Sequence, residues 1–424
     1  MFSFIPAEKY CEKVFDGTHE TPKPTNTGYK LITSKHILSG KIDSDNAYYI
    51  SEEDYNSINK RSQVRQWDIL FSMIGSVGNV YLVKKKDINF AIKNMGVFSC
   101  NDKNKALLLY FYLKSPYAKK FIENYLNGAV QKFLSLDMLR NFPIPLFNEN
   151  DKKLYNLLYN IEEKIELNNN ISTSLDTLAK SIYNYWFLQF EFTNEEGKPY
   201  RSSGGKMVWS EELKREIPEK FVVENIRTKC DIIDCLHSKK PEYHYDKDEY
   251  YLLELENLTE SGYIDIGTKY YISEDDYRKW TKNIEISEND FVITNAGRTG
   301  AIGKIPKGIT CALGRNFTAI RPRDINPIYL REYFKSNYFL EQMLGNLDLG
   351  SFFKSFNVKS IKQLNILIPE KYVLSQFTEI VAPMISKIEN NILENIELSA
   401  LRDFLLPLLM NGQVTFKDEK ECPA

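Results

Sequence analysis

The sequence predicts an α+β chain in which two similar mixed α/β domains are separated by two long antiparallel helices that form a coiled coil with pseudo-twofold symmetry. Two observations predict this fold. The 424-residue chain repeats itself at an offset of 222 residues, which indicates a duplicated domain rather than a solenoid of short repeats. After each copy, apolar residues step along the chain by four and three, which is typical of a long helix with one packed seam.

The duplication is clearest in a tyrosine-rich segment. YYISEEDY, residues 48–55, recurs as YYISEDDY, residues 270–277, with seven of eight positions identical. The same offset aligns further glycines, aspartates and a lysine without a gap. These residues are Gly40, Asp43, Asp68, Gly75, Gly78, Gly128 and Lys132, which match Gly262, Asp265, Asp290, Gly297, Gly300, Gly350 and Lys354.

The first copy is expected to occupy residues 1–148. Short β-rich runs bounded by turn residues indicate strands at 29–32 and 68–71, and a helix is expected over about 104–126. The prolines at 143–145 are typical of a strand-like exit into the next helix. Because the chain starts abruptly, we expect the N-terminal strand of this copy to be shorter than that of the second, or paired differently.

The second copy is expected within residues 193–369. Residues 193–218 are polar and rich in glycine and serine, which favours a linker into this copy. A strand is expected at 250–253 and a helix over about 326–344, and the copy ends in a second strand-like exit at 366–369.

The two helices are expected at 149–192, as a central spacer, and at 370–424, as a C-terminal spacer with a tail. Both seams carry an asparagine at the same register, Asn168 and Asn391. In an antiparallel pair these amides would meet near the midpoint and fix the register, at a cost in stability. Fraying of the seam at this point is the alternative, and the sequence leaves both open.

The net charge of −2 is unevenly distributed. Residues 1–145 carry +6, residues 201–369 are neutral, and the two predicted helical segments, 146–200 and 370–424, carry −4 each. A basic first domain suits a nucleic-acid ligand, whereas the neutral second domain needs a local basic patch to bind one. The acidic helices favour a protein-facing role.

The lengths of the apolar runs argue against a membrane protein, and the spacing of the cysteines argues against a metal site. No apolar run approaches the roughly 18 residues that span a bilayer, and the N-terminus lacks the features of a signal peptide, so we expect a cytoplasmic protein. Cys230 and Cys235 lie near His237 and His244, but zinc sites usually have tighter paired spacing. We therefore favour buried thiols and expect neither a metal nor a cofactor in this chain.

Catalytic motifs are missing. The sequence has no Pro-Pro dipeptide, which the motif of DNA amino-methyltransferases requires, and GRTGAIGK at 297–304 has the wrong spacing for a phosphate-binding loop. His19 and His237 occupy equivalent positions in the two copies. A paired site is conceivable, but we favour a role in stabilising turns beside Asp16 and Asp234.

Two loops in each copy suit DNA recognition. A strand followed by a glycine loop occurs at 71–79 and again at 293–301, and a second glycine loop with aligned lysines occurs at 128–133 and 350–355. Glycine lets backbone approach a ligand closely, and hydroxyl, amide and cationic side chains bind phosphates and base edges. The candidate DNA-binding residues are Ser72, Ser76, Asn79, Lys132, Lys239, Asn295, Arg298, Thr299, Arg315 and Lys354.

Taken together, these features resemble the specificity subunit of type I restriction–modification systems. The resemblance rests on the DGTH-x-TP start at 16–22, the Asp-Ile-Leu/Val strand with its glycine loop, and the Ile-Pro exits. It also rests on SIYNYWFLQFEF at 181–192, followed by Ile217-Pro218, and on the ending LLPLLMNGQVTF at 405–416. It extends over nearly the whole chain.

The resemblance implies two target recognition domains, each reading one half of a split, asymmetric double-stranded DNA site. The helices would set the gap between the half-sites and dock two modification subunits, which would bind S-adenosylmethionine and methylate adenine. A further restriction subunit would translocate and cut DNA. Two alternatives remain: a DNA-modifying enzyme with a fused catalytic activity, and an adaptor that bridges proteins.

Overall fold

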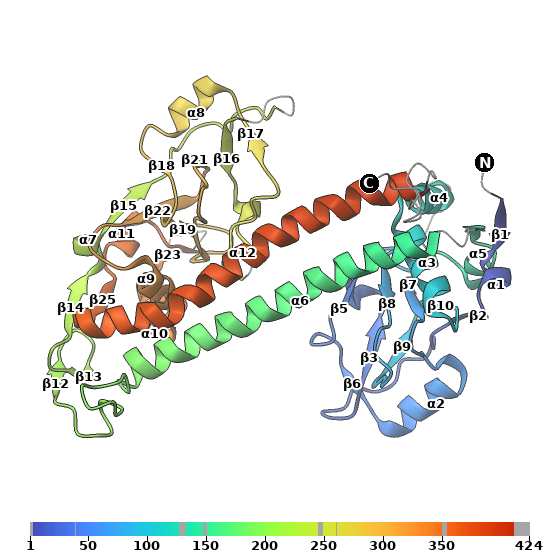
Figure 1. The fold of residues 1–424 in the computed structure, drawn as a ribbon, viewed down its shortest axis with the longest axis horizontal. Coiled ribbons are helices and arrows are strands. Elements are labelled where there is room, and N and C mark those ends of the chain that lie inside the picture. Colours follow the sequence, from blue (N-terminus) through green and yellow to red (C-terminus); the bar gives the residue numbers. More distant parts are fainter. Residues whose placement is uncertain are drawn as a thin grey trace, which may run out of the picture. The chain divides into compact units, whose positions relative to one another are not determined.

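The computed structural model describes residues 3–38, 40–126, 133–146, 151–244, 249–259, 261–349 and 354–410. The chain divides into two compact units, one formed by Met1–Glu166 with Glu397–Ala424 and the other by Leu167–Ile396. Each unit combines one globular lobe with a part of each of two long helices (Figure 1).

The first lobe is mixed α/β. Its main sheet has the strand order β2-β10-β7-β8, and a smaller sheet, β6-β3-β9, includes the parallel pair β3 and β9. Its elements are β1 Phe4–Pro6, α1 Ala7–Tyr10, β2 Lys13–Asp16, β3 Tyr29–Thr33, η1 Ser34–His36, β4 Ile37–Leu38, β5 Lys41–Ile42, β6 Tyr49–Ile50, α2 Glu52–Ser62, β7 Ile69–Ser72, β8 Val80–Leu82, β9 Phe90–Lys93, β10 Met95–Ser99, α3 Lys103–Lys114, α4 Pro116–Leu126, α5 Leu136–Arg140 and β11 Pro143–Pro145.

The second lobe repeats this topology. Its main sheet, β15-β22-β19-β20, has the order of the first, and its smaller sheet, β17-β16-β21-β18, again contains one parallel pair, β16 and β21. Its elements are β12 Met207–Ser210, β13 Arg215–Pro218, β14 Val222–Asn225, α7 Ile226–Lys229, β15 Cys230–Asp234, β16 Tyr251–Leu253, η3 Leu255–Asn257, β17 Tyr270–Tyr271, α8 Glu274–Trp280, β18 Glu285–Ile286, β19 Phe291–Thr294, β20 Ile302–Lys304, β21 Cys311–Leu313, β22 Phe317–Pro322, α9 Pro327–Phe334, α10 Asn337–Gly345, β23 Asp348–Leu349, β24 Lys354–Ser355, α11 Val358–Ile361 and β25 Asn365–Ile368.

The central strands of both main sheets are buried on both faces. Every residue of β7, ILFS, and of β19, FVIT, is buried, as continuous apolar runs of this length predict. The cores also take in the long helices. Leu158 belongs to the core of the first lobe, and Phe377 and Val381 belong to that of the second. Each lobe is therefore attached to the long helices by its own hydrophobic core.

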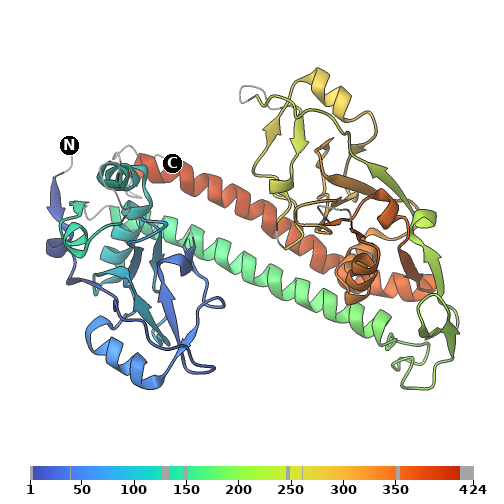
Figure 2. The same ribbon diagram turned by 180° about the vertical axis from the view of Figure 1, so that it is seen from behind.

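The two long helices are α6, Asp151–Tyr183, which ends in a π-helical turn at Asn184–Leu188, and α12, Lys371–Met410. Within each unit, their segments lie side by side in both views (Figures 1 and 2). In the second unit, Asn168 bonds to Asn391 while Tyr183 packs against Phe377, so the two segments are antiparallel. The structure thus confirms two mixed α/β lobes and long antiparallel helices.

Asn168 and Asn391 contact each other, which is the first of the two predicted alternatives; the second was fraying of the helical seam. Both are buried, and the Asn391 amide donates to the backbone carbonyl of Asn168 at 3.2 Å and to the Ser172 hydroxyl at 3.1 Å. The Asn168 amide in turn donates to Glu394 at 2.8 Å and to Asn395 at 3.0 Å. The seam does not fray here, since a polar network replaces the apolar contacts.

Three local predictions are refined or corrected by the structure. The helical stretches expected at 104–126 and 326–344 are confirmed, and each consists of two helices. They are divided at Ser115 and at Ser336, whose side chains accept hydrogen bonds from the first turn of the following helix. A serine in this position caps a new helix rather than continuing the old one. The predicted linker at 193–218 is folded, with the antiparallel hairpin β12–β13 and Phe192 stacked on Tyr200 at 4.6 Å.

The N-terminal strand of the first lobe is shorter than its counterpart, as one of the two predicted alternatives required, because β1 has three residues and β14 has four. The other alternative, a different pairing, is wrong. The first lobe does begin with a strand, since β1 pairs with β11 through Phe4 and Pro145, in the way that β14 pairs with β25 through Val222 and Ile368. Ile217 and Pro218 lie instead in the hairpin β12–β13, which precedes β14. The predicted difference between the lobes therefore reflects an additional hairpin in the second one.

Candidate nucleic-acid interface

The glycine loop after β7 and the one after β19 share one backbone design. The Ser72 hydroxyl donates to the backbone carbonyl of Ser76 and accepts from the backbone amide of Asn79 at 2.9 Å. The Thr294 hydroxyl does the same with the carbonyl of Arg298 and the amide of Ala301, the latter at 3.0 Å. A buried hydroxyl thus fixes each loop from the inside, whatever side chains the loop displays.

The glycines of these loops have two different roles. Gly75 and Gly297 have φ values of 76° and 80°, and a Cβ atom at either would meet nothing within 4 Å. A Cβ atom at Gly300 would lie 1.9 Å from the sulfur of Met343 on α10. The first glycine of each loop therefore supplies a left-handed turn at an open tip, and Gly300 also allows close packing against a helix.

Several predicted residues of the second lobe come together around its glycine loop. The Thr299 hydroxyl donates to the backbone carbonyl of Lys354 at 3.4 Å. The backbone amide of Asn295 donates to the backbone carbonyl of Asn316, next to Arg315, at 2.7 Å. The side chains of Arg315 and Lys354 are exposed, as is much of Arg298, although its guanidinium also donates to the carbonyl of Leu258. The loop therefore presents a local basic patch.

Asn295 and Ser72 do not form part of the exposed surface. Asn295 is buried and accepts a hydrogen bond from the Thr318 hydroxyl at 2.9 Å. Ser72 is fully buried and engaged within its loop. Sequence reasoning singled them out because they are polar and lie beside glycines, but both side chains hold the scaffold and neither is free to reach a ligand.

In the first lobe, Ser76 is exposed, whereas the half-buried Asn79 donates from its amide to the carbonyl of Ile37 at 3.0 Å. Lys132 lies outside the described residues. The sequence analysis missed Ile74 and Phe133, which form an isolated antiparallel β-bridge at this loop and are both exposed. Their exposure could not be foreseen, because an apolar residue beside a buried strand normally packs in the core.

Lys239 stands apart from these loops in the sequence, on the segment that follows β15. Its side chain is exposed, and the neighbouring Lys240 lies 3.4 Å from Glu254. Part of the positive charge predicted for this segment is therefore neutralised by an acidic neighbour, and Lys239 remains the better candidate of the two.

The two equivalent histidines stabilise turns, as favoured from the sequence. The Nε2 atom of His19 lies 3.0 Å from Asp16, and that of His237 lies 3.2 Å from Asp234. Asp234, His237 and Cys235 bring ligand-type atoms within 4.8 Å of one another. Burial raises the pKa of the Cys235 thiol, which disfavours the thiolate that zinc binds.

A buried charged network connects the second lobe to α6. The Asp176 carboxylate forms ion pairs with Arg331, at 2.7 Å, and with Lys335, and it accepts a hydrogen bond from the Tyr263 hydroxyl at 3.0 Å. Arg331 also forms an ion pair with the fully buried Glu332. Burial alone would raise the pKa of Asp176, but Arg331 and Lys335 hold it below its ordinary value. Burial raises the pKa of Glu332. This network positions the lobe and is not aimed at solvent.

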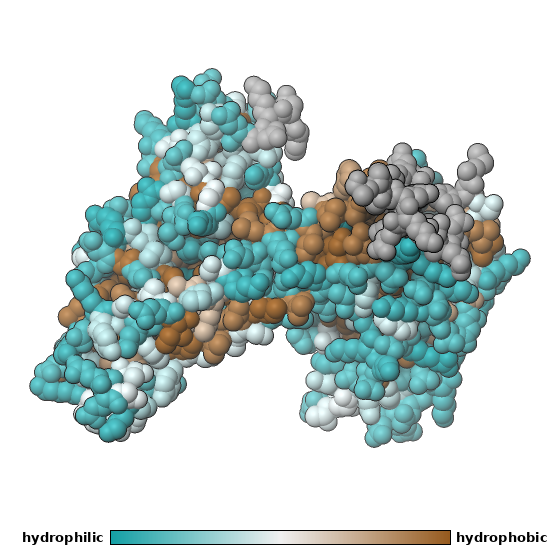
Figure 3. Space-filling view, viewed as in Figure 1, coloured by the Kyte–Doolittle hydropathy of each residue, from teal (hydrophilic) through white to brown (hydrophobic). Residues whose placement is uncertain are grey.

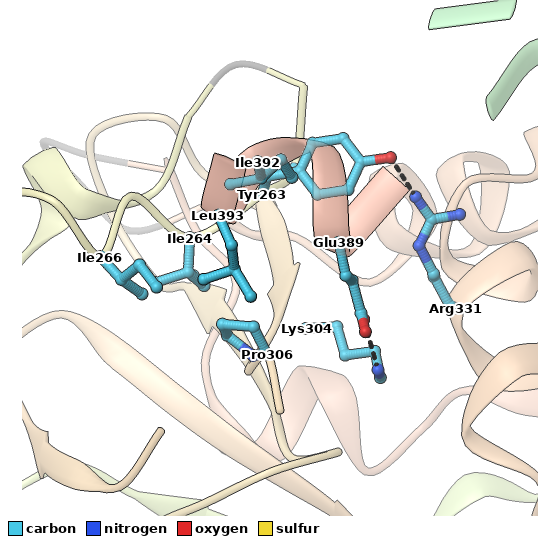
Figure 4. Close-up of a pocket in the computed structure, with 10 residues that line it drawn as sticks. Tyr263, Ile264, Ile266, Lys304, Pro306, Arg331, Glu389, Ile392 and Leu393 are labelled. Atoms are coloured by element: carbon cyan, nitrogen blue, oxygen red, sulfur yellow. Dashed lines mark hydrogen bonds and ion pairs between the residues drawn. The ribbon is translucent and has the colours of Figure 1, made fainter. Parts of the chain in front are cut away.

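A cavity of about 20 Å³ lies beside this network, between β20 and α12 (Figure 4). Lys304 pairs with Glu389 across it at 2.7 Å, and the Arg331 guanidinium donates to the Tyr263 hydroxyl at 2.7 Å. The volume is about that of one water molecule. The cavity is therefore a feature of the packing between lobe and helix rather than a substrate site.

Comparisons with known proteins agree on one family. Residues 19–177 match the type I restriction modification DNA specificity domain. The type I restriction enzyme MjaIX specificity subunit of Methanocaldococcus jannaschii is 21% identical over 318 residues, which cover 73% of this chain and 69% of that protein. The EcoBI specificity subunit of Escherichia coli is 26% identical over 245 residues, which cover 53% of this chain and 49% of that protein.

The fold has a solved counterpart. The S subunit of a type I restriction–modification system from M. genitalium matches with a TM-score of 0.59 at 15% identity, over 99% of this chain and 96% of that one. The family match ends within α6, yet the second lobe repeats the sheet order of the first. Both lobes are therefore copies of one domain type.

Proposed function

The chain belongs to the family of type I restriction–modification specificity subunits, and on this basis we propose that it reads a bipartite, asymmetric DNA site as a non-catalytic subunit. No helix among the described residues is long and apolar enough to cross a membrane. Action on DNA beside its partner subunits suits a protein of the cytoplasm.

One observation carries the proposal: the two lobes repeat one loop backbone with different side chains. The bonds made by Ser72 and by Thr294 are the same, whereas Ser76 is replaced by Arg298 and Ile74 by Ala296. Two readers of unlike half-sites need a common scaffold and unlike reading residues. An adaptor that bridges two identical partners would gain nothing from this divergence.

The DNA-facing residues of the proposal are the exposed candidates. In the second lobe, Arg298 is suited to a guanine edge, and Arg315 and Lys354 are suited to phosphates. Ser76 and Lys132 are the corresponding candidates of the first lobe, and Lys239 supplements the second. Replacing Arg298 with alanine should relax selectivity at one position of the second half-site, by about 1–3 kcal/mol, and leave the first unchanged.

The helices are proposed as both a spacer and a docking surface for two modification subunits, which would carry S-adenosylmethionine; a restriction subunit would complete the complex. Apolar side chains remain exposed along them, and the visible face in Figure 3 has hydrophobic patches over the long helices within an otherwise largely hydrophilic surface. These residues are Leu157, Leu167, Leu178, Tyr185, Ile380, Leu393, Leu401 and Phe404. Exposed apolar surface of this kind is typical of protein interfaces.

The decisive experiment is single-molecule sequencing of adenine methylation in the source cell, with the gene deleted and then restored. We expect one bipartite methylation motif to disappear on deletion and to return on restoration. An unchanged set of motifs would contradict the proposal, as would DNA methylation or cleavage by the purified chain alone.

A further inference from the structure

We propose that the first lobe reads its half-site through an apolar contact to the C5-methyl group of a thymine, made by the side chains of Ile74 and Phe133. The second lobe has the small residues Ala296 and Ser355 at the equivalent positions and would read without this apolar contact. This inference rests on the proposed function and deepens it, because it assigns a recognition chemistry to one of the two half-sites.

The two side chains form a single exposed apolar tip. Ile74 is 49% exposed and Phe133 is 47% exposed, and the two residues are paired across an antiparallel bridge. The amide of Leu134 donates to the carbonyl of Met73 at 3.0 Å, which ties the segment of Phe133 to the glycine loop. Neighbouring Gly75 faces open space. The pair is therefore held in place by backbone bonds and not by burial.

The repeat identifies this tip as a ligand-facing position. At the offset of 222 residues, Ile74 corresponds to Ala296 and Phe133 to Ser355, and the bond from Leu134 to Met73 corresponds to one from Phe356 to the carbonyl of Asn295 at 3.0 Å. In the second lobe this same edge carries the basic patch of Arg298, Arg315 and Lys354. The first copy keeps lysines at two of these three positions, Lys93 and Lys132, but has Ser76 in place of Arg298. The large apolar side chains of Ile74 and Phe133 are therefore what distinguishes this edge in the first copy.

The chemistry of the tip selects its target on DNA. The loop from Ser72 to Asn79 has no charged side chain, so it cannot neutralise phosphates. Among the base edges exposed in the major groove, only thymine offers an apolar group, its methyl, and apolar side chains bind it there. Exposed Ser76 lies on the same loop and provides a hydroxyl for a neighbouring hydrogen bond.

The test removes the methyl group of thymine from the DNA and leaves the protein unchanged. The complete complex with its modification subunits is titrated with its bipartite target, in which each thymine of the first half-site is replaced in turn by deoxyuridine. We expect one replacement to weaken binding about fourfold, which is the effect of one buried methyl-sized group. Replacements in the second half-site should have no such effect.

Matched variants assign the effect to the tip. In complexes carrying Ile74→Ala or Phe133→Ala, thymine and deoxyuridine should bind equally at that position, while Trp209→Ala, which truncates a similarly exposed apolar residue on β12, should retain the fourfold difference. Unfolding temperatures of all variants should stay close to that of the original chain, because the truncated side chains are exposed.

The inference would be overturned by a first half-site without thymine, by no deoxyuridine effect at any position, or by an undiminished effect in both tip variants. Loss of modification subunits from the tip variants, with unchanged DNA selectivity, would assign the pair to protein docking instead and would also overturn it. In each case the methylation motif of the original chain persists, so failure of this inference is distinct from failure of the proposed function.

Discussion

Ser72 and Thr294 show how a buried residue can support a proposed recognition loop without lying on its surface. Each hydroxyl satisfies one carbonyl and one amide of the loop that it supports, and each is buried. Sequence reasoning identified the loops correctly from their glycines but assigned Ser72 and Asn295 to the DNA surface. A polar side chain beside a flexible turn looks the same in a sequence whether it points inward or outward, and only packing decides between the two.

Thr294→Val keeps the shape of the side chain but removes both loop bonds. We expect it to lower the free energy of unfolding by about 0.5–1.5 kcal/mol, because the backbone amide of Ala301 loses one of its two acceptors and keeps only the carbonyl of Arg298. Thr294→Ser keeps the hydroxyl, as Ser72 does in the first lobe, and should cost much less. Urea unfolding of the three proteins measures the difference, and equal stability of the two variants would contradict the assigned role.

Gly300→Ala should destabilise the chain more than Gly297→Ala. Both positions have φ close to 80°, so alanine is strained by about 1–2 kcal/mol at either. Only at Gly300 would the new Cβ atom also collide with Met343. Thermal unfolding should therefore rank the chain as original, then Gly297→Ala, then Gly300→Ala, and the reverse order of the two variants would refute the close packing.

At the scale of elements, the strands that the sequence predicted are confirmed, whereas the division of the helical stretches and the hairpin before the second lobe were not predicted. The runs expected at 29–32, 68–71 and 250–253 are β3, β7 and β16 within a residue or two. The division at Ser115 had a signal in the sequence, because Pro116 follows it and proline is typical of the first position of a helix. The division at Ser336 had no such signal, since no proline follows that serine. The hairpin β12–β13 was missed because its composition resembles that of a flexible linker.

The joint between α9 and α6 depends on Asp176. Asp176→Asn should lower the free energy of unfolding by about 2 kcal/mol, because Arg331 and Lys335 lose a charged partner. The pKa of Asp176 is below its ordinary value of 3.8, so its contribution is fully present above that pH and is lost only as the pH falls through the lowered value.

Urea unfolding of the original chain and of Asp176→Asn at pH 5 and at pH 8 should therefore give the same difference in stability. Lys198→Ala, which removes an exposed pair with Glu196, is the control and should have little effect at either pH. A difference that grows or vanishes between pH 5 and pH 8 would show that Asp176 is not the group responsible.

At the scale of the whole molecule, the duplication is what made the fold predictable. A single copy would have offered only weak motifs, whereas two copies with the same offset in their strands, loops and helical seams support each other. The side chains that each loop exposes could not be predicted from the sequence, and the exposed pair Ile74 and Phe133 became evident only in the folded structure.

The spacer role predicts the effect of shortening both helices together. Removing seven residues from α6 and seven from the facing segment of α12 shortens the pair by about 10 Å and nearly preserves its packed face. The methylation motif should keep both half-sites, while the unread gap shrinks by about three base pairs. Alanine replacement of the exposed positions in the same heptads, without a change in length, is the control. A gap of unchanged length in the shortened protein would contradict the spacer role.

The internal fixing of the glycine loops has an evolutionary consequence. Since the hydroxyls of Ser72 and Thr294 stabilise the loop backbone from beneath, substitutions at the tip alter what is displayed without remodelling what supports it. If these loops read DNA as proposed, new target preferences would arise by point mutation at positions such as 74, 76, 296 and 298, one lobe at a time. A host lineage could in this way diversify one half of its methylation signature while inheriting the other half intact.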